Sequence, residues 1–303
     1  MKHLYHFCIS SGNEVMYRSE DDYIRAFNCF AIALYRTDSK ALADAFMTNH
    51  LHACVETADI KGVIFQYRAM YSRYFNHKYH RLGTLGERYP FVLDIVGVYH
   101  RLAALSYTLR NPLHHGIAAT PFAYNHSSAN AIFRKELGKP DVTNLLSRNK
   151  YYRYLPDKAE IPSHYIMSGN GLLLRESVLD IPQAEYFYNT PRNYLFYMNR
   201  LSGEEWEKEQ SKDNHSPLTL NDIEKSADRQ TILSMLRNEH GRENYRIPSD
   251  TEICQIIDHE YLPKYGVKSV YQLTERLKQQ IGNDLIQKFH FNRLKVARCL
   301  IML

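Results

Sequence analysis

The chain has 303 residues, of which 44% are hydrophobic and 23% charged, an ordinary globular composition that excludes a disordered chain. With 38 Lys and Arg against 33 Asp and Glu, the formal net charge of +5 permits a polyanionic partner without requiring one. The five scattered cysteines include no CxxC pair, which excludes a zinc ribbon and a disulfide scaffold and favours a reducing, cytoplasmic compartment. No apolar stretch reaches the ~18–20 residues of a membrane-spanning helix, and neither a signal peptide nor a membrane partner is expected.

Residues 1–125 are predicted to form an α+β unit. The alternating run HLYHFCIS (3–10) predicts a strand. A helix is expected over 19–36, where Ser19 and three acidic residues precede apolar residues at helical spacing. Residues 41–57, which contain NHLH, are predicted to form the edge of a strand pair or a central strand.

The second half of this unit repeats the alternation of helix and strand. A long helix with basic and aromatic residues is predicted over 60–80, and a short strand over 91–95. The last helix, 96–111, is expected to stop at Asn111 because a proline follows it.

The rest of the chain divides into a Pro- and Tyr-rich middle region, 126–215, and a helical tail, 216–303. Within the middle region, the hydrophilic stretch 202–217 is interpreted as an exposed linker or helix surface. The tail is expected to be helical from residue 218 onwards.

The end of the tail resembles the last part of a helix-turn-helix. There Asn292 precedes a short basic helix that carries Arg293, Lys295 and Arg298. A recognition helix for DNA and a plain helical bundle both fit this pattern.

The sharpest local motif is His50-Leu51-His52. On a strand, residues i and i+2 face the same side, so both imidazoles would project together and could hold a divalent ion. The chain has 15 histidines, so chance can also produce this spacing.

Tyr107 and Asn111 lie four residues apart on the predicted helix and therefore on one face of it. The amide oxygen of Asn111 could supply a third metal ligand, and Tyr107 would lie one turn away. A tyrosine hydroxyl becomes a useful nucleophile toward a phosphodiester when a metal polarises the phosphate. The alternative is that Tyr107, one of 24 tyrosines, packs the helix against the sheet. His114 and His115 follow this helix, where they could approach a phosphate, and receive no assigned role.

Three segments in this order resemble the HUH single-tyrosine transposases, and within them the REP-associated branch. They are AFMTNHLHACVET, QYRAMYSRYFNHKYHRLG and YHRLAALSYTLRNPLHHG. The resemblance places His50 and His52 on the two histidine ligands, Tyr107 on the nucleophile and Asn111 on the third ligand. It covers about residues 1–125. Thr48 stands where the family usually has proline, and LGERYPFVLDI replaces a commonly basic strand.

The resemblance implies a ferredoxin-like HUH nuclease domain, followed here by a mainly α-helical region. It further implies cleavage and rejoining of single-stranded or hairpin DNA with Mg²⁺ or Mn²⁺, through a 5′-phosphotyrosine link to Tyr107. A homodimer is expected from the resemblance alone. The altered segment 86–95 supports one alternative, a domesticated DNA-binding protein that no longer cuts. A third reading is an RNA-binding or adaptor protein that acts through its helical tail.

The distribution of charge independently favours a nucleic-acid partner. Residues 61–115 hold eight Lys and Arg against two acidic residues, with aromatic residues between them, a mixture that suits single-stranded DNA. The candidate DNA-binding residues are Lys61, Arg68, Arg73, Lys78 and Arg81. The interleaved rings Tyr67, Tyr71, Tyr74 and Phe75 share one helix face and could instead belong to the core.

Overall fold

The structure is a computed structural model that describes residues 1–156, 159–199 and 248–302. It is a mixed α/β fold built on a four-stranded antiparallel sheet in the order β2-β3-β1-β4. The strands are β1 (His3–Ser10), β2 (Lys40–Met47), β3 (His50–Thr57) and β4 (Phe91–Asp94).

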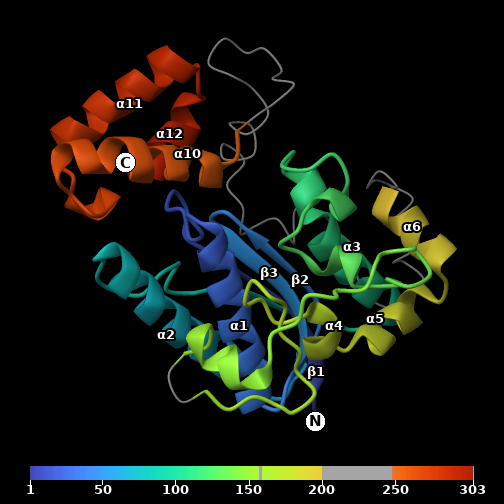
Figure 1. The fold of residues 1–303 in the computed structure, drawn as a ribbon. Coiled ribbons are helices and arrows are strands. Elements are labelled where there is room, and N and C mark those ends of the chain that lie inside the picture. Colours follow the sequence, from blue (N-terminus) through green and yellow to red (C-terminus); the bar gives the residue numbers. More distant parts are fainter. Residues whose placement is uncertain (157–158, 200–247, 303) are drawn as a thin grey trace.

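Helices α1 (Glu20–Arg36) and α2 (Ile60–Tyr79) cover one face of the sheet (Figure 1). Both confirm the predicted positions, and in both an aspartate carboxylate accepts a backbone hydrogen bond at the start of the helix. The carboxylate of Asp22 accepts a hydrogen bond from the backbone N–H of Ser19 at 2.9 Å, and that of Asp59 accepts one from Gly62 at 2.8 Å. Capping thus fixes where each helix starts.

Of the two alternatives over 41–57, the structure shows a strand pair, because the chain turns back at Thr48 and Asn49 and forms the hairpin of β2 and β3. The backbone carbonyls of these two residues accept hydrogen bonds from Met16 and Ser11. Contacts with a distant loop therefore set the turn, and the local pattern does not reveal them.

Helix α3 (Val98–His114) covers the other face and continues through Pro112, so the predicted stop at Asn111 is wrong. A proline within a helix removes one hydrogen bond, but its φ angle is compatible with helical geometry. The next bonds are made again, since the N–H of His115 donates to the carbonyl of Asn111. Asn111 thus stays in helical register with Tyr107.

The middle region packs onto the same core as the sheet, so the expected boundary near residue 125 does not divide this core. Three 3-10 turns, η1 (Pro121–Ala123), η2 (Ser128–Asn130) and η3 (Arg148–Arg153), precede three helices. The helices are α4 (Arg175–Val178), α5 (Ile181–Tyr188) and α6 (Pro191–Asn199). A buried ion pair joins this region to the sheet, with Arg175 donating to both carboxylate oxygens of Asp44 at 3.0 and 3.1 Å.

The C-terminal helices form a second apolar core at one end of the sheet (Figure 1). They are α10 (Asp250–Ile256), α11 (Glu275–Phe289) and α12 (Arg293–Leu300). Between α10 and α11 lie a π-helical turn, η4 (Ile257–Tyr261), and two 3-10 turns, η5 (Leu262–Tyr265) and η6 (Val270–Gln272). The expected stretch 202–217 and the helical run over 218–247 lie outside the described residues.

The interpretation of α12 as a recognition helix is not supported. Lys295 is buried and donates to the backbone carbonyl of Pro248 at 2.7 Å, and Arg298 is buried against Asp250 at 2.7 Å. Of the three expected basic contacts, Arg293 alone is exposed. The described part of the tail matches the alternative, a plain helical bundle. No helix in the described ranges is long and apolar enough to cross a membrane.

Candidate functional site

The two histidines of the HxH motif project from β3 toward α3. The rings of His50 and His52 lie 5.0 Å apart between centroids, at an angle of 85°. The ring of Tyr107 lies 5.5 Å from that of His52. The sheet and α3 therefore bring together side chains that lie more than fifty residues apart in the sequence.

Asn111 completes the predicted set. The Nε2 atom of His50 lies 3.2 Å from Oδ1 of Asn111, and its Nδ1 atom lies 2.8 Å from Oδ1 of Asn49. One ring nitrogen of His50 thus lies against Asn49 and the other against the expected third ligand. A neutral imidazole carries one N–H, so it can donate to only one of these two oxygens.

His52 is held from one side only. Its Nδ1 atom lies 3.2 Å from Nε2 of His6, a histidine on β1, and the two rings stack at 5.2 Å. The Nε2 atom of His52 is buried and has no hydrogen-bond partner among the described residues. That nitrogen is therefore available to a ligand.

Burial keeps these imidazoles neutral at physiological pH. Desolvation lowers the pKa of His6 to about 3 and that of His50 to about 4. For His50 the hydrogen bond to Asn111 raises the pKa and the charge of Arg298 lowers it, both less than desolvation does. The pKa of His52 is also lowered, first by burial and then by the neighbouring histidines. Neutral rings keep the lone pairs that a metal ligand needs.

The donor chemistry of this set suits a divalent ion. Two neutral imidazoles and an amide oxygen leave open coordination positions for water and substrate oxygens, as a catalytic site requires. No group of three or more His, Cys, Asp or Glu side chains within the described ranges is arranged to hold a metal. The set offers two imidazoles, and the amide oxygen of Asn111 could serve as a third ligand. The buried, unpartnered Nε2 of His52 supports the fit.

Two further histidines at this site have no role in the sequence analysis. His6 is fully buried, and its ring lies 5.9 Å from that of Tyr107. It faces His52 because Cys8 pairs with His52, which places His6 diagonally across on the same face of the sheet. His115 is 1% exposed, and its ring lies 5.0 Å from that of His50. Strand pairing would have indicated His6, but the sequence does not give the register.

The middle region covers the outer side of α3. Helices α5 and α6 pack against it, and the hydroxyls of Ser106 and Tyr188 lie 3.0 Å apart. Tyr107 is 3% exposed and His52 is fully buried. The candidate site is therefore closed to large molecules in this conformation.

Two of the five predicted DNA-binding residues form ion pairs within the protein. Lys78 donates to the buried carboxylate of Asp22 at 2.7 Å, and Arg81 forms two hydrogen bonds to Glu14 at 2.6 and 2.9 Å. These ion pairs connect the C-terminal end of α2 to Asp22 and Glu14, so the charges of both cations are largely compensated.

The other three line two grooves on either side of α2. Lys61 and Arg68 line a groove of about 800 Å³ beside β4. Arg73 lines a groove of about 380 Å³ next to α1, together with Arg25 and Arg36. The sequence pattern does not predict Arg25 and Arg36 as DNA-binding residues, because they lie on α1, a helix whose other residues are mostly buried.

Most of the interleaved aromatic rings belong to the core. Tyr67, Tyr71 and Phe75 are at most 1% exposed, and Tyr74 is partly buried with its hydroxyl donating to Asp22 at 2.9 Å. Stacking of DNA bases on these buried rings is excluded in this conformation, and the core alternative is the correct one.

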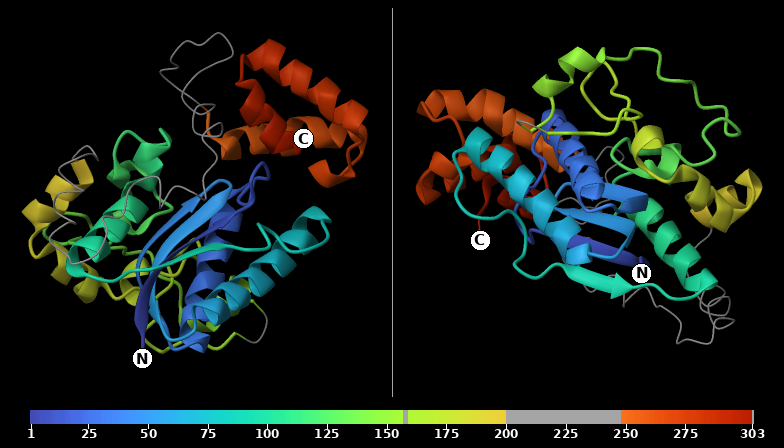
Figure 2. Two further views of the ribbon diagram at one scale, coloured as in Figure 1. Left: turned by 180° about the vertical axis from the view of Figure 1, so that it is seen from behind. Right: turned by 90° about the horizontal axis from the view of Figure 1, so that it is seen from below.

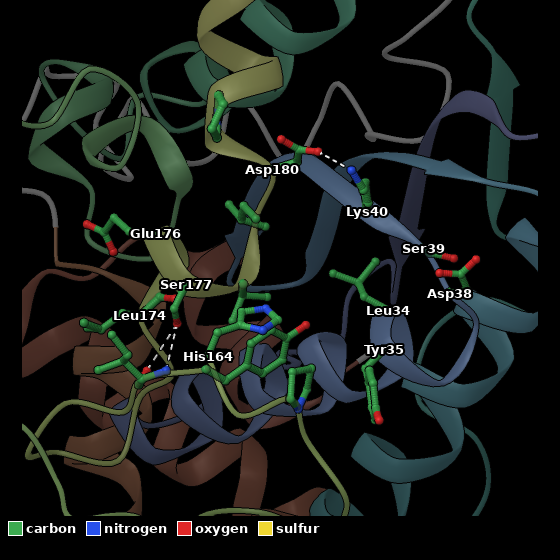
Figure 3. Close-up of a pocket in the computed structure, with 16 residues that line it drawn as sticks. Leu34, Tyr35, Asp38, Ser39, Lys40, His164, Leu174, Glu176, Ser177 and Asp180 are labelled. Carbon is green, nitrogen blue, oxygen red and sulfur yellow. Dashed lines mark hydrogen bonds and ion pairs between the residues drawn. The ribbon is translucent and has the colours of Figure 1, made fainter.

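A separate pocket of about 600 Å³ lies between the end of α1, the start of β2 and residues 162–182 (Figure 3). Its polar groups are largely satisfied, since Lys40 pairs with Asp180 at 2.8 Å and Ser177 bonds to backbone groups. It contains none of the predicted site residues and receives no role here.

No protein-family model matches the sequence, and no curated protein matches it. Among solved structures, that of a REP-associated tyrosine transposase bound to a REP hairpin is similar to this chain, with a TM-score of 0.39 and 13% sequence identity. The similarity covers 48% of this chain and 90% of that chain. A likeness this distant does not show the family, so the assignment of function depends on the site itself.

Proposed function

We propose that this protein cleaves and rejoins single-stranded DNA through a covalent bond to Tyr107. One observation carries the proposal: β3 and α3 bring His50, His52 and Asn111 together beside the ring of this tyrosine. A purely structural role of these residues predicts no such convergence of polar groups on one buried point. The domain would be ferredoxin-like, which the order β-α-β-β-α-β and the strand order β2-β3-β1-β4 support.

In this mechanism the phenolic oxygen of Tyr107 forms a bond to phosphorus, and the bond from phosphorus to the 3′ oxygen breaks. The phenolic proton passes, in net terms, to that 3′ oxygen. The products are a 5′-phosphotyrosine and a free 3′ hydroxyl, and the reverse step rejoins a strand. Because the phosphodiester is exchanged rather than hydrolysed, no external energy source is needed.

His50, His52 and Asn111 would hold Mg²⁺ or Mn²⁺, which would polarise the phosphate and stabilise the charge that develops on it. The protein contributes the orientation of these ligands. Asn49 can accept from Nδ1–H of His50, which leaves the lone pair of Nε2 on the side of Asn111, and His6 holds the ring of His52. Because both rings are fixed, these side chains would need to move little when a metal ion binds.

DNA must reach this site past the elements that bury it. Helices α5 and α6 pack on α3, and the turn before β3 is covered by the C-terminal helices. Binding of the strand would therefore be coupled to a movement of one of these two covers. A homodimer stays a prediction.

The test is a denaturing gel of the full chain incubated with Mn²⁺ and a library of hairpin oligonucleotides that carry single-stranded tails. The label belongs at the 3′ end, because a 5′-phosphotyrosine retains the 3′ part of the strand. Wild type should give a slow, protease-sensitive labelled band that Tyr107→Phe lacks. As a matched control, Tyr188→Phe removes another buried hydroxyl next to α3 and should keep the band.

Two other outcomes of the gel would contradict the proposal. DNA binding by wild type without any band would favour the non-cutting DNA-binding alternative. A band that persists in Tyr107→Phe would assign the nucleophile to another residue.

A further inference from the structure

The groove between α2 and β4 is lined by an unusual mixture of side chains. It has a volume of about 800 Å³ and lies beside the edge strand of the sheet. Its wall is formed by two segments, 61–69 of α2 and 84–92. The second comprises the loop that returns alongside α2 to the sheet edge and the first two residues of β4 (Figure 2). Phe91 contacts His6 on the α3 face, so its neighbour Val92 faces the opposite side. The groove is thus separate from the Tyr107 site.

Two large aromatic side chains in this groove face solvent. Phe65 is 68% exposed and Tyr89 is 78% exposed. Clustered exposed apolar surface of this kind marks an interaction site, because a folded chain otherwise buries it. They differ in this from the aromatic rings of α2 that are buried in the core.

The charge of the groove is of one sign. Lys61, Arg68 and Arg88 line it, and no carboxylate of the described residues does. Lys61, Phe65 and Arg68 are spaced by four and three residues on α2 and share one face. The guanidinium of Arg88 lies 5.3 Å from the ring centroid of Tyr89. Cations therefore flank each exposed ring.

The loop that carries Tyr89 is fixed in place. Arg68 donates to the backbone carbonyls of Gly86 and Arg88 at 3.3 and 3.4 Å. Gly86 has a φ angle of +84°, and a Cβ there would lie 2.9 Å from Ile9. A side chain at that position would be strained and would clash, so the loop needs this glycine. The groove is therefore preorganised for a ligand.

We propose that this groove binds unpaired bases of single-stranded DNA. Phe65 and Tyr89 stack on the bases, while Lys61 and Arg88 contact the flanking phosphates. A ring can stack on any base whose face is free, which a duplex does not offer. An acidic peptide would use the cations but leave the aromatic rings without a role. The identity of the polymer as DNA rests on the proposed function, but the groove does not use Tyr107.

The experiment measures binding of a 15-nucleotide single strand that carries one 2-aminopurine, with EDTA present so that no cleavage occurs. Wild type should quench the 2-aminopurine on binding, as a stacked base does. Phe65→Ala and Tyr89→Ala should each weaken binding about tenfold and remove part of the quenching. Both side chains are exposed, so the variants should fold, which circular dichroism verifies.

Four further variants define the site. Tyr186→Ala removes an equally exposed ring on α5 (79% exposed) and should bind as wild type does. Phe65→Trp should retain binding, because it keeps a stacking surface. Lys61→Gln and Arg88→Gln should each reduce the slope of log affinity against log salt by about 0.7.

Wild-type affinity in Phe65→Ala and Tyr89→Ala would overturn the proposal, as would an equal loss for the same sequence as a duplex. If instead Phe65→Ala dissociates a dimer detected by sedimentation and leaves DNA binding intact, the groove is a protein interface and the proposal is wrong. The adduct assay on Tyr107 is independent of these outcomes. A band from Tyr107 with normal binding by the groove variants would contradict this inference alone.

Discussion

The hydroxyl of Thr48 donates a hydrogen bond of 3.0 Å to Oδ2 of Asp250, 202 residues further along the chain. Asp250 also accepts two hydrogen bonds from Arg298, at 2.7 and 3.1 Å. Thr48 belongs to the turn that precedes His50, so the buried carboxylate links the C-terminal helices to one end of the candidate site. These helices therefore support the position of the HxH strand as well as their own core.

We expect Asp250→Ala to lower the free energy of unfolding by about 3–5 kcal/mol, because it leaves the guanidinium of Arg298 buried without a counter-charge. Urea unfolding followed by circular dichroism measures this loss. The double variant Asp250→Ala/Arg298→Met should recover part of it, since an apolar side chain removes the uncompensated charge. A loss below 1 kcal/mol would mean that solvent reaches Arg298.

The same carboxylate should make stability depend on pH in acid. Burial alone raises the pKa of Asp250, but the attraction of Arg298, with Lys295 and the hydrogen bonds from Arg298 and Thr48, outweighs it and leaves the pKa below its usual value. A depressed folded-state pKa gives a contribution that is fully present above the unfolded value of ~3.9 and is lost as the pH falls through the folded value.

Asp250→Asn removes this titration while it keeps the size of the side chain. The stability difference between wild type and Asp250→Asn should therefore be constant near neutral pH and shrink below about pH 4. Urea unfolding at a series of pH values measures it. A difference that grows toward low pH would have the wrong sign and would assign the acid dependence to another group.

The sequence predicts best those elements whose patterns are local. The alternation over 3–10 and the capped apolar spacing of 19–36 depend on neighbouring residues alone, and both predictions are confirmed. The turn at Thr48 and the helix through Pro112 could not be predicted, because backbone hydrogen bonds to distant residues or buried packing decide them. Local propensity yields to tertiary context at such places.

The residues of the candidate site also divide into those that local spacing predicts and those that only the tertiary structure brings together. Spacing places His50 with His52 and Tyr107 with Asn111, and the structure brings the two pairs together. His6 could not be predicted as a site residue, because its position beside His52 depends on the register between β1 and β3. For the basic residues, the sequence gives charge but not partners. Lys78 and Arg298 both pair with buried carboxylates.

The proposed metal ligands predict binding of a divalent ion without DNA. His50→Ala combined with His52→Ala should abolish Mn²⁺ binding measured by calorimetry, because an amide oxygen alone is a weak ligand. His77→Ala combined with His80→Ala removes two exposed histidines from the end of α2 and should bind Mn²⁺ as wild type does. Unchanged binding in the His50/His52 variant would remove the metal from this site.

The last prediction concerns the proton shared by His6 and His52. Their facing nitrogens, Nε2 and Nδ1, lie 3.2 Å apart, and both rings are neutral, so one nitrogen donates and the other accepts. If Nδ1 of His52 donates, its Nε2 carries a lone pair, which is the form that a metal ligand requires. We therefore expect His52 to be the Nδ1–H tautomer, which long-range ¹H–¹⁵N correlation of the imidazoles measures in the metal-free protein.

His6→Leu should remove the acceptor and weaken Mn²⁺ binding about 10–100-fold. His6→Gln can still accept through its amide oxygen and should lose less. An Nε2–H tautomer in wild type, or equal Mn²⁺ affinity in wild type and His6→Leu, would show that His6 packs beside His52 without orienting it.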